Sequence, residues 1–260
     1  MSEASVPIVL VNGMQASADQ LAHPALVNDG HFTAMQVRNR RVRGLAYHLV
    51  RLRGAHAELY GTELDAEYLR AMIQCAVRHH PDASLRLNLY EARPGQPQVM
   101  TAIRPPVEAD HRAQSLLPVA YSRPFAHIKH VGSFAQIRYA MHANKAGYDD
   151  AVLITSDGRI CESTVANIGF LDRDTVVWPE APLLHGITWQ LLDQVLGQRG
   201  IAVRRRPVSL ESAANFAGAF LANSIGVVPI SRIAQHDYQP DNATFTHIRQ
   251  TYDEVAWDEI

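Results

Sequence analysis

A lone lysine, Lys129, lies in the segment His-Ile-Lys-His at residues 127–130. Apolar residues surround it, with Phe125 and Ile128 before it and Val131 after it. Burial in such surroundings disfavours the ammonium form and lowers the pKa of a lysine. The neutral amine can attack an aldehyde and form a Schiff base. Lys129 is therefore a candidate carbonyl-reactive nucleophile.

A carboxylate follows in the segment Cys-Glu-Ser-Thr-Val-Ala-Asn at residues 161–167. The turn Ser-Asp-Gly at 156–158 predicts a strand-turn-strand that leads into this segment. A reactive amine and a carboxylate that face one flat cationic ring are what pyridoxal phosphate (PLP) chemistry requires. We therefore expect Lys129 and Glu162 to serve one cofactor.

Residues that suit a phosphate group follow in the second half of the chain. Gly186 precedes a helix predicted over Thr188–Gln198, and the free N–H groups of a first helical turn attract anions. The Thr188 hydroxyl adds a donor in this interpretation. In the alternative, Gly186 is a plain turn and Thr188 a helix cap. The segment Leu-Ala-Asn-Ser-Ile-Gly at 221–226 is a second strand end that can donate to the same phosphate.

Other common sites are missing from the sequence. It has no Gly-x-Gly-x-x-Gly, no Gly-x-x-x-x-Gly-Lys-Ser/Thr loop and no Gly-x-Ser-x-Gly elbow. The close histidine pairs, His79 with His80 and His127 with His130, have no matching cysteine or carboxylate cluster. We therefore predict no metal site, and Lys129 becomes the leading reactive group.

The composition is that of an ordinary globular enzyme, with 260 residues, 47% of them hydrophobic and 19% charged. The formal net charge of −2 gives no indication of nucleic-acid binding or of an anionic membrane surface. No apolar stretch is long enough to span a bilayer, and the start Met-Ser-Glu-Ala-Ser-Val-Pro lacks a signal-peptide pattern. The two cysteines, Cys75 and Cys161, indicate no disulfide framework. We expect a cytoplasmic protein.

Hydrophobic periodicity predicts a mixed α and β chain in two domains. We predict a smaller N-terminal α+β domain at 1–115, a proline-rich interdomain linker at 116–124 and a larger C-terminal cofactor-binding domain at 125–260. The first domain is predicted to contain helices at 47–60 and 66–79 and strands at 7–12, 31–38, 41–45, 84–91 and 98–103. The second is predicted to contain helices at 134–146, 188–198 and 245–257, a short helix after Ser209, and strands at 150–155, 159–163, 167–171, 175–178, 201–206 and 218–222.

With these residues assembled, nearly the whole chain resembles the class IV aminotransferases, the fold-type IV PLP enzymes. That group includes branched-chain and D-amino-acid aminotransferases and aminodeoxychorismate lyase. The order of the segments carries the resemblance: Asn28–Thr33 is similar to Gly-Asp-Gly-x-Phe, His48–Leu52 to His-x-x-Arg-Leu, Tyr148–Ala151 to Ala-Asp-Glu-Ala, and Glu162–Asn167 to Glu-x-x-x-x-Asn. It implies an α+β fold of two α/β domains with the active site between them.

The resemblance also implies roles for single residues. Lys129 is expected to form the Schiff base, and Glu162 to pair with the pyridine nitrogen so that the ring stays protonated. Asn167 completes the Glu-x-x-x-x-Asn signature. The residues expected to hold the phosphate are Arg51, Gly186, Ile187, Thr188 and Ser224.

Two positions depart from the family pattern. The family often has arginine directly after Gly-Ile-Thr, where this chain has Trp189. Many members have a tyrosine five residues beyond the lysine to bond the phenolic oxygen of the cofactor, and here that residue is Phe134. Ser133 or a water would then serve the oxygen.

Two reactions fit the resemblance, and we expect a PLP-dependent aminotransferase-like enzyme acting on an amino acid or amine. The alternative is 4-amino-4-deoxychorismate lyase, which releases pyruvate and 4-aminobenzoate. Ile-Lys-His at 128–130, Phe-Thr at 32–33 and Asn-Ser at 223–224 resemble the lyase, whereas Gly132 and Ser133 do not. A non-catalytic scaffold of the same fold would be expected to lose Lys129 or Glu162, and neither is lost.

The substrate is left open by the sequence. Thr33, Arg86 and Arg93 are candidate substrate-binding residues, and Arg138 is a further candidate for the carboxylate. The expected partners are an amino donor and a keto-acid acceptor, with no nucleic acid and no membrane. A homodimer is also expected, because relatives complete each active site with a loop from the partner subunit.

Overall fold

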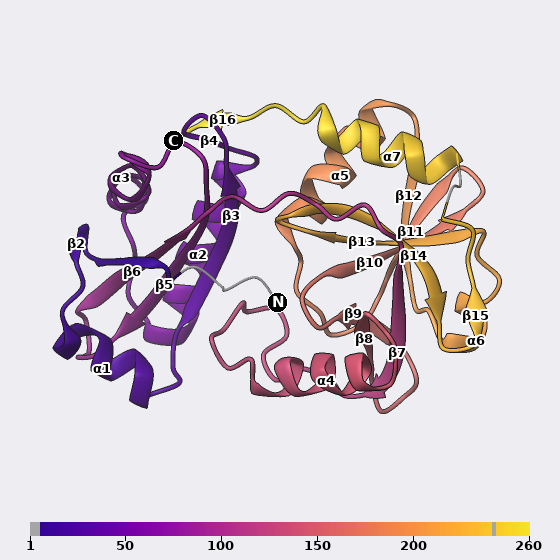
Figure 1. Cartoon of the computed structure of the whole chain (residues 1–260), viewed down its shortest axis with the longest axis horizontal. Coiled ribbons are helices and arrows are strands. Elements are labelled where there is room, and N and C mark those ends of the chain that lie inside the picture. The colour runs from indigo at the N-terminus through magenta and orange to yellow at the C-terminus, as the bar shows by residue number, and fades with distance from the viewer. Residues whose placement is uncertain (1–5, 241–242) are drawn as a thin grey trace. The chain divides into compact units, whose positions relative to one another are not determined.

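The computed structural model describes residues 6–240 and 243–260, which form two compact units (Figure 1). Unit 1 comprises the described residues up to Val107 together with Ile128–Gly132 and Ala256–Ile260. Unit 2 comprises the described residues of Glu108–His127 and Ser133–Val255. The first five residues, on which the signal-peptide expectation rested, lie outside the described part.

Unit 1 is built on an antiparallel sheet in the order β2-β1-β6-β5-β3, so that β3 is an edge strand. A separate short pairing joins β4 to β16. The elements are β1 (Ile8–Val11), β2 (Met14–Gln15), α1 (Ala18–Leu26), β3 (His31–Val37), β4 (Arg41–Val42), α2 (Leu45–Tyr60), α3 (Ala66–Val77), β5 (Ala83–Glu91), β6 (Pro97–Arg104) and β16 (Asp258–Glu259).

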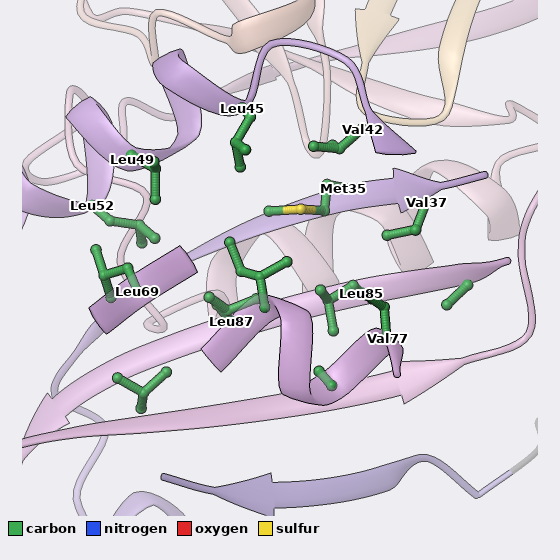
Figure 2. Packing of buried hydrophobic residues seen from close by; sticks show 14 of the residues in the cluster. Met35, Val37, Val42, Leu45, Leu49, Leu52, Leu69, Val77, Leu85 and Leu87 are labelled. Carbon is green, nitrogen blue, oxygen red and sulfur yellow. The ribbon is translucent and has the colours of Figure 1, made fainter. Parts of the chain in front are cut away.

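The core of unit 1 lies between the sheet and the helices α2 and α3. Side chains alternate between the two faces of a strand, and Met35 and Val37 of β3 and Leu85 and Leu87 of β5 point to the same side (Figure 2). There they pack against apolar side chains of both helices, including Leu52. The intervening strand residues face the other way, which leaves that face free to carry polar groups.

Helix α2 ends where its sequence predicts. Gly61 adopts a left-handed φ of 69°, and its N–H donates to the Ala57 carbonyl. At the other end, Gly44 offers no side-chain cap, and a distant residue supplies one because Asp258 accepts from the Leu45 N–H at 2.8 Å. The final residues of the chain therefore stabilise the start of α2.

Unit 2 is built on a larger sheet. Its path runs β12-β11-β10-β13-β14-β7-β8-β9, and β9 pairs again with β10, so six of the described strands form a closed ring of pairings. The elements are β7 (Gln114–Ala120), α4 (Phe134–Lys145), β8 (Asp150–Ile154), β9 (Ile160–Ser163), β10 (Asn167–Asp172), β11 (Thr175–Pro179), α5 (Ile187–Gln198), β12 (Ala202–Arg206), α6 (Leu210–Ala213), β13 (Gly218–Asn223), β14 (Gly226–Ile233), β15 (His236–Asp237) and α7 (Ala243–Asp253).

The structure differs from the predicted domain boundaries in two places. The expected linker at 116–124 largely coincides with β7, which pairs in parallel with β8 and β14. Its prolines suggested a linker, but burial of Leu116 and Val119 outweighs the one hydrogen bond that Pro118 cannot donate. Residues 128–132, expected in the C-terminal domain, belong to unit 1 because they pair with β3.

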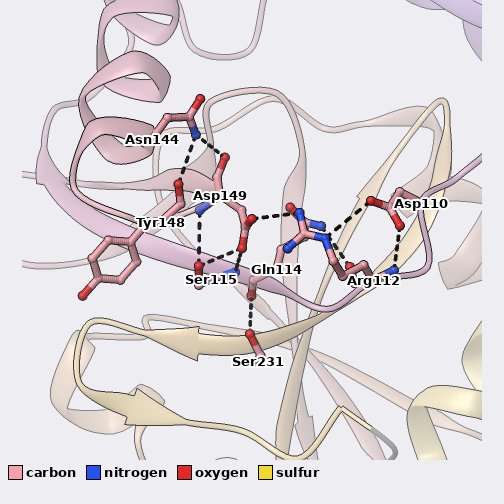
Figure 3. Close-up of polar contacts among 8 residues, drawn as sticks. All are labelled: Asp110, Arg112, Gln114, Ser115, Asn144, Tyr148, Asp149 and Ser231. Carbon is pink, nitrogen blue, oxygen red and sulfur yellow. Dashed lines mark hydrogen bonds and ion pairs between the residues drawn. The ribbon is translucent and has the colours of Figure 1, made fainter. Parts of the chain in front are cut away.

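A polar network secures the segment that resembles Ala-Asp-Glu-Ala (Figure 3). Asp149 accepts from both the N–H and the hydroxyl of Ser115 at 2.7 Å and pairs with Arg112 at 2.9 Å. Asn144 donates to the carbonyls of Tyr148 and Asp149. These bonds join the end of α4 to the starts of β7 and β8, so the motif has a structural role in unit 2.

The membrane expectation can be compared with the helices of the structure. Within residues 6–240 and 243–260, no helix has both the length and the apolar character needed to cross a bilayer.

Candidate active site

Lys129 is attached to the free edge of β3 in unit 1. The Phe32 N–H donates to the Lys129 carbonyl at 2.8 Å, and the Val131 N–H donates to the Gly30 carbonyl at 2.9 Å. The Lys129 Nζ atom lies 4.9 Å from the centroid of the Phe32 ring. The lysine is thus held by backbone bonds against the segment that resembles Gly-Asp-Gly-x-Phe.

Gly30 is required at this position. Its φ is 141°, and a Cβ atom would lie 2.7 Å from the Leu89 carbonyl oxygen on β5. The glycine therefore allows the start of β3 to approach β5 closely while its other edge receives the lysine segment.

Arg51 points from α2 into unit 1 with only part of its hydrogen-bonding capacity used. One guanidinium Nη donates to the Thr33 hydroxyl, whereas the buried Nε has no partner among the described residues. No carboxylate pairs with it in the described part of unit 1, and burial lowers the pKa of Arg51 to about 10. A cation in such a position calls for a bound anion.

Thr33 connects Arg51 to a buried histidine. Its hydroxyl accepts from Arg51 and shares a hydrogen bond of 2.6 Å with His48 Nδ1, in which the donor depends on the tautomer of the imidazole. Burial, followed by the charges of Arg51 and Lys129, holds the pKa of His48 well below its usual value. Thr33, a candidate substrate residue in the sequence, is fully buried and orients the arginine.

The three other candidate arginines occupy different settings. Arg86 lies on β5 with its Cζ 3.6 Å from the centroid of the Phe32 ring, and its Nε donates to Asn88 at 2.8 Å. Burial, and then the charge of Arg104, lowers the pKa of Arg86 to about 10. Arg93 is exposed in the turn between β5 and β6, and Arg138 is exposed on α4 in unit 2.

Glu162 lies on β9 in unit 2 and is only 6% exposed. Its carboxylate accepts from Arg123 Nε at 2.8 Å and from the Leu184 N–H at 3.3 Å. Arg123 also donates to the Ala126 carbonyl. Sequence reasoning missed Arg123, because it lies outside any periodic element and meets Glu162 only in the folded unit.

Asn167 lies directly opposite Glu162 in the β9–β10 pairing, which explains the fixed spacing of the two residues. A tight turn joins them, and the Ser163 N–H donates to the Ala166 carbonyl at 2.8 Å. The Asn167 side chain donates to the Leu184 carbonyl at 2.7 Å and accepts from the Gly186 N–H at 3.2 Å. Glu162 and Asn167 therefore both support the 184–186 turn.

The turn leads into α5 with its N–H groups exposed to a ligand. Gly186 is the N-cap and has no side chain to satisfy the first turn, which leaves N–H groups there without helical partners. A Cβ atom on Gly186 would lie 2.1 Å from Asn167 Oδ1, so a larger residue here would displace the Asn167 side chain from the turn. Ile187 and Thr188 are the first helical residues and carry these N–H groups.

The Thr188 hydroxyl ties α5 to a second turn. It donates to the Asn223 carbonyl at 2.7 Å, at the end of β13. Ser224 follows in the turn before β14, and its hydroxyl has no partner among the described residues. The backbone N–H groups of α5 and the Ser224 hydroxyl are therefore the donors that unit 2 offers to an anion.

The two unusual positions have clear settings. Trp189 is buried, stacks on Trp178 with 4.7 Å between ring centroids, and donates to Asp193 at 3.0 Å. It replaces an arginine with a packed indole that fastens the first turn of α5. Phe134 is 76% exposed at the start of α4.

In the described part of the chain, no group of three or more His, Cys, Asp or Glu residues could hold a metal ion.

Three known proteins are similar to this chain in sequence or in fold. A probable branched-chain amino-acid aminotransferase from Rickettsia felis is 32% identical over 118 residues, which cover 44% of this chain and only 40% of the relative's length. A hypothetical aminotransferase from Mycobacterium tuberculosis, in its alpha-ketoglutarate- and PMP-bound form, has a TM-score of 0.85 at 19% identity and covers 95% of this chain and 98% of its own. A candidate 4-amino-4-deoxychorismate lyase from Legionella pneumophila has a TM-score of 0.79 at 16% identity, with 89% and 93% covered.

The two structural likenesses confirm the predicted mixed α and β fold, since they extend over almost the whole of each chain. The family model of the amino-transferases of class IV matches residues 30–233, which is more than half of the sequence. The chain therefore belongs to the class IV aminotransferases, a family of enzymes that use pyridoxal phosphate.

Proposed function

We propose that this chain is a PLP-dependent aminotransferase that acts on an amino acid or amine through a covalent bond between Lys129 and the cofactor. One observation carries the proposal. The amine of Lys129 and the unpaired guanidinium of Arg51 belong to the same unit, where no carboxylate neutralises Arg51 among the described residues. Such a pair suits a molecule with both a carbonyl and a phosphate.

The donors of unit 2 also suit a cofactor that carries a phosphate. The first turn of α5 and the Ser224 hydroxyl offer N–H and O–H donors to a phosphate. Glu162 offers a carboxylate to the protonated ring nitrogen, and Arg123 at 2.8 Å stabilises its ionised form. When bound, PLP supplies a protonated ring that accepts the electron pair released when a substrate loses its α-proton.

Lys129 then has a second task. Once the substrate amine has displaced it, its Nζ atom is free to remove the proton from the substrate α-carbon. In an aminotransferase the same Nζ atom would hold this proton and give it back later in the reaction. The backbone bonds from Phe32 and Val131 hold the lysine in place between these two transfers.

We propose that Arg86 binds the carboxylate of the substrate. Its guanidinium stacks on the Phe32 ring, which Lys129 Nζ also approaches, so both cations lie on one aromatic side chain of unit 1. Among the described residues Arg86 donates from its Nε to Asn88, which leaves its Nη groups available for a bidentate contact. Arg93 is exposed in a turn and has no such neighbour.

The lyase is the second candidate because a specific likeness favours it. The segments at 128–130 and 223–224 resemble the lyase, and the Legionella structure shares the fold over 89% of this chain. Both reactions begin with proton removal by Lys129. They differ in whether the amino group is transferred to a keto acid or pyruvate is expelled.

The partners follow from this function. We propose an amino-acid donor and a keto-acid acceptor, which is supported by the alpha-ketoglutarate in the Mycobacterium tuberculosis structure.

We also propose a cytoplasmic homodimer. Phe134, Ile137 and Met141 are 76%, 57% and 44% exposed and recur on one face of α4, where a second copy would cover them. Light scattering of the purified protein measures the mass of the assembly.

The test of the proposed function uses the lysine content of the chain. Lys129 and Lys145 are its only lysines, so reduction with borohydride after incubation with PLP, followed by peptide mapping, assigns the adduct to one residue. The expected adduct is on Lys129, and it should vanish in Lys129→Ala but persist in Lys145→Ala. Labelling of Lys145 alone would refute the assignment.

The reaction type is then read from products. Branched-chain amino acids should be tested first as donors, given the Rickettsia relative. Formation of the keto acid with an acceptor present supports the aminotransferase. Pyruvate released from aminodeoxychorismate without any acceptor favours the lyase instead.

A further inference from the structure

Three titratable side chains form a buried chain inside unit 1, next to the strand that holds Lys129. The His31 Nε2 atom lies 3.3 Å from His56 Nδ1, and His56 Nε2 lies 3.4 Å from Glu91 Oε1. His31 and His56 are 1% and 0% exposed, and the Glu91 side chain is 5% exposed. His31 is the variable residue of the segment Asn28–Thr33, whereas His56 and Glu91 lie outside the segments that resemble the family. None of the three has a role in the proposed site.

The Glu91 end of this chain of residues is anchored by hydrogen bonds. The Glu91 carboxylate accepts from the Thr62 hydroxyl at 3.0 Å and from the Gly95 N–H at 2.7 Å, which anchors it in the turn after β5. His56 Nε2 faces this carboxylate at ion-pair distance without a hydrogen-bond partner among the described residues, and His56 Nδ1 shares a hydrogen bond with His31 whose direction depends on the tautomers. The chain therefore runs from the β5 turn, through α2, to the first residue of β3.

The end of this chain coincides with the attachment point of the lysine. His31 pairs with His130, and the two backbone bonds that flank this pair are the ones that hold Lys129 and Val131. A strand end at an edge frays readily unless side chains fix it. The Tyr60 ring covers both histidines, at 4.8 Å from His56 and 6.4 Å from His31.

Such an arrangement is costly if it serves packing alone. Burying polar groups lowers stability unless they are bonded, and apolar side chains of similar size commonly pack as well or better. The hydrogen bond between the two histidines and the ion-pair contact of His56 with Glu91 specify the orientation of each ring, which apolar packing does not. The charged and titratable groups around it are Arg51, which acts on His31, and Asp29, which accepts from Tyr60.

We propose that the Glu91–His56–His31 chain positions Lys129, by holding the start of β3 to which the lysine segment is hydrogen-bonded. These are positioning residues, because they act through the backbone of β3 and do not touch the amine. The inference rests on the proposed function only in that it takes Lys129 to be the reactive lysine. The backbone effect is independent of the reaction.

The variants are chosen to separate orientation from bulk. His56→Phe keeps a ring against Tyr60 but removes the hydrogen bond to His31 and the polar contact with Glu91, whereas His56→Gln can restore one of these two interactions. Glu91→Gln removes the charge with little change in shape. Tyr68→Phe is the control, since it deletes a hydrogen bond to Asn12 in unit 1 near the opposite edge of the sheet.

Two measurements follow on the apoprotein. The first is hydrogen exchange at the Phe32 and Val131 amides, the two donors of the bridge. The second is the rate at which pyridoxal, which has no phosphate, labels Lys129 relative to exposed Lys145 after borohydride reduction. Pyridoxal isolates the position of the amine from the grip on the phosphate.

In His56→Phe and Glu91→Gln, we expect exchange at both amides to rise and relative labelling of Lys129 to fall, each on the order of tenfold. His56→Gln should recover part of both losses, and Tyr68→Phe should leave both unchanged. Unchanged protection and labelling in folded His56→Phe would overturn the proposal, as would an equal effect in Tyr68→Phe. If the unmodified protein fails to label Lys129, the proposed function fails, and exchange at the two amides still decides the positioning role.

Discussion

Replacement of Arg51 by methionine should raise the free energy of unfolding of the apoprotein and reduce the stabilisation that PLP adds. Burial lowers the pKa of Arg51 from 12.5 to about 10, so keeping the guanidinium charged in the folded state costs about 3 kcal/mol at about 1.4 kcal/mol for each pH unit. The substitution also loses the bond to Thr33, worth about 1 kcal/mol. The free energy of unfolding of apo Arg51→Met should therefore rise by about 2 kcal/mol.

The sign of this effect follows from linkage. Arg51 is a base whose pKa is lowered by folding, so below about pH 10 it is protonated in both states and its charge opposes folding. The penalty disappears only as the pH rises through the interval between the folded and unfolded pKa values. At neutral pH the whole penalty is present, and methionine removes it.

Cofactor binding should change in the opposite direction. Arg51 has its Nε and further N–H groups available to a phosphate, and charge-assisted bonds contribute about 1.5–3 kcal/mol each. A loss of about 3 kcal/mol weakens PLP binding by about 100-fold. The stabilisation that PLP adds should shrink accordingly.

Urea unfolding with and without PLP tests both effects. Arg53→Met is the matched control, because Arg53 lies on the same helix, is exposed and donates to the Leu64 carbonyl at 3.0 Å. It should lose stability slightly and keep its response to PLP. If apo Arg51→Met were less stable than the parent and still gained full stability from PLP, Arg51 would not be an unpaired phosphate ligand.

Three further predictions address the scaffold around the site. Gly186→Ala places a Cβ atom 2.1 Å from Asn167 Oδ1 and should lower the free energy of unfolding by about 2 kcal/mol or more. Urea unfolding of the double variant with Asn167→Ala should recover part of this loss. Strictly additive losses would contradict a clash between the two residues. The pKa of His31 is lowered by burial to about 3, so the unfolded chain takes up a proton below about pH 6.5 while the folded protein does not. Below that pH the free energy of unfolding should therefore fall by about 1.4 kcal/mol per pH unit more than in His31→Gln. Parallel pH profiles of the two proteins would refute this. Asp258→Ala removes the acceptor at the start of α2 and should cost about 1 kcal/mol, whereas Glu259→Ala, which breaks an exposed ion pair, should cost less than about half of that.

Local patterns predicted several elements well. The helix predicted at 47–60 is observed at Leu45–Tyr60 and ends at Gly61, because hydrophobic period and a terminal glycine are local signals. Other elements of the structure were not predicted. Helix α1 buries no residue, and it contains Pro24, a residue type that usually ends or kinks a helix. The strand β14 at Gly226–Ile233 was not predicted, although it follows β13 directly in a tight hairpin. Its other partner, β7, is distant in the sequence and gives no local signal.

The candidate site was predictable only in part. Lys129 and Glu162 could be named because each lies in a short recognisable segment. Arg123 could not, because its ion pair with Glu162 spans 39 positions. The link between His31 and Glu91 has no local signal either, since it passes through a residue of α2.

The sequence by itself determined the family, the cofactor and the residue types available for chemistry, since these follow from short segments in a fixed order. Tertiary structure decided how those residues are held. It assigned Lys129 to the edge of β3, turned Thr33 into a support for Arg51, and used the Thr188 hydroxyl for the Asn223 carbonyl. The physical reason is that hydrogen bonds and burial pair groups by distance in space, which the spacing along a chain does not specify.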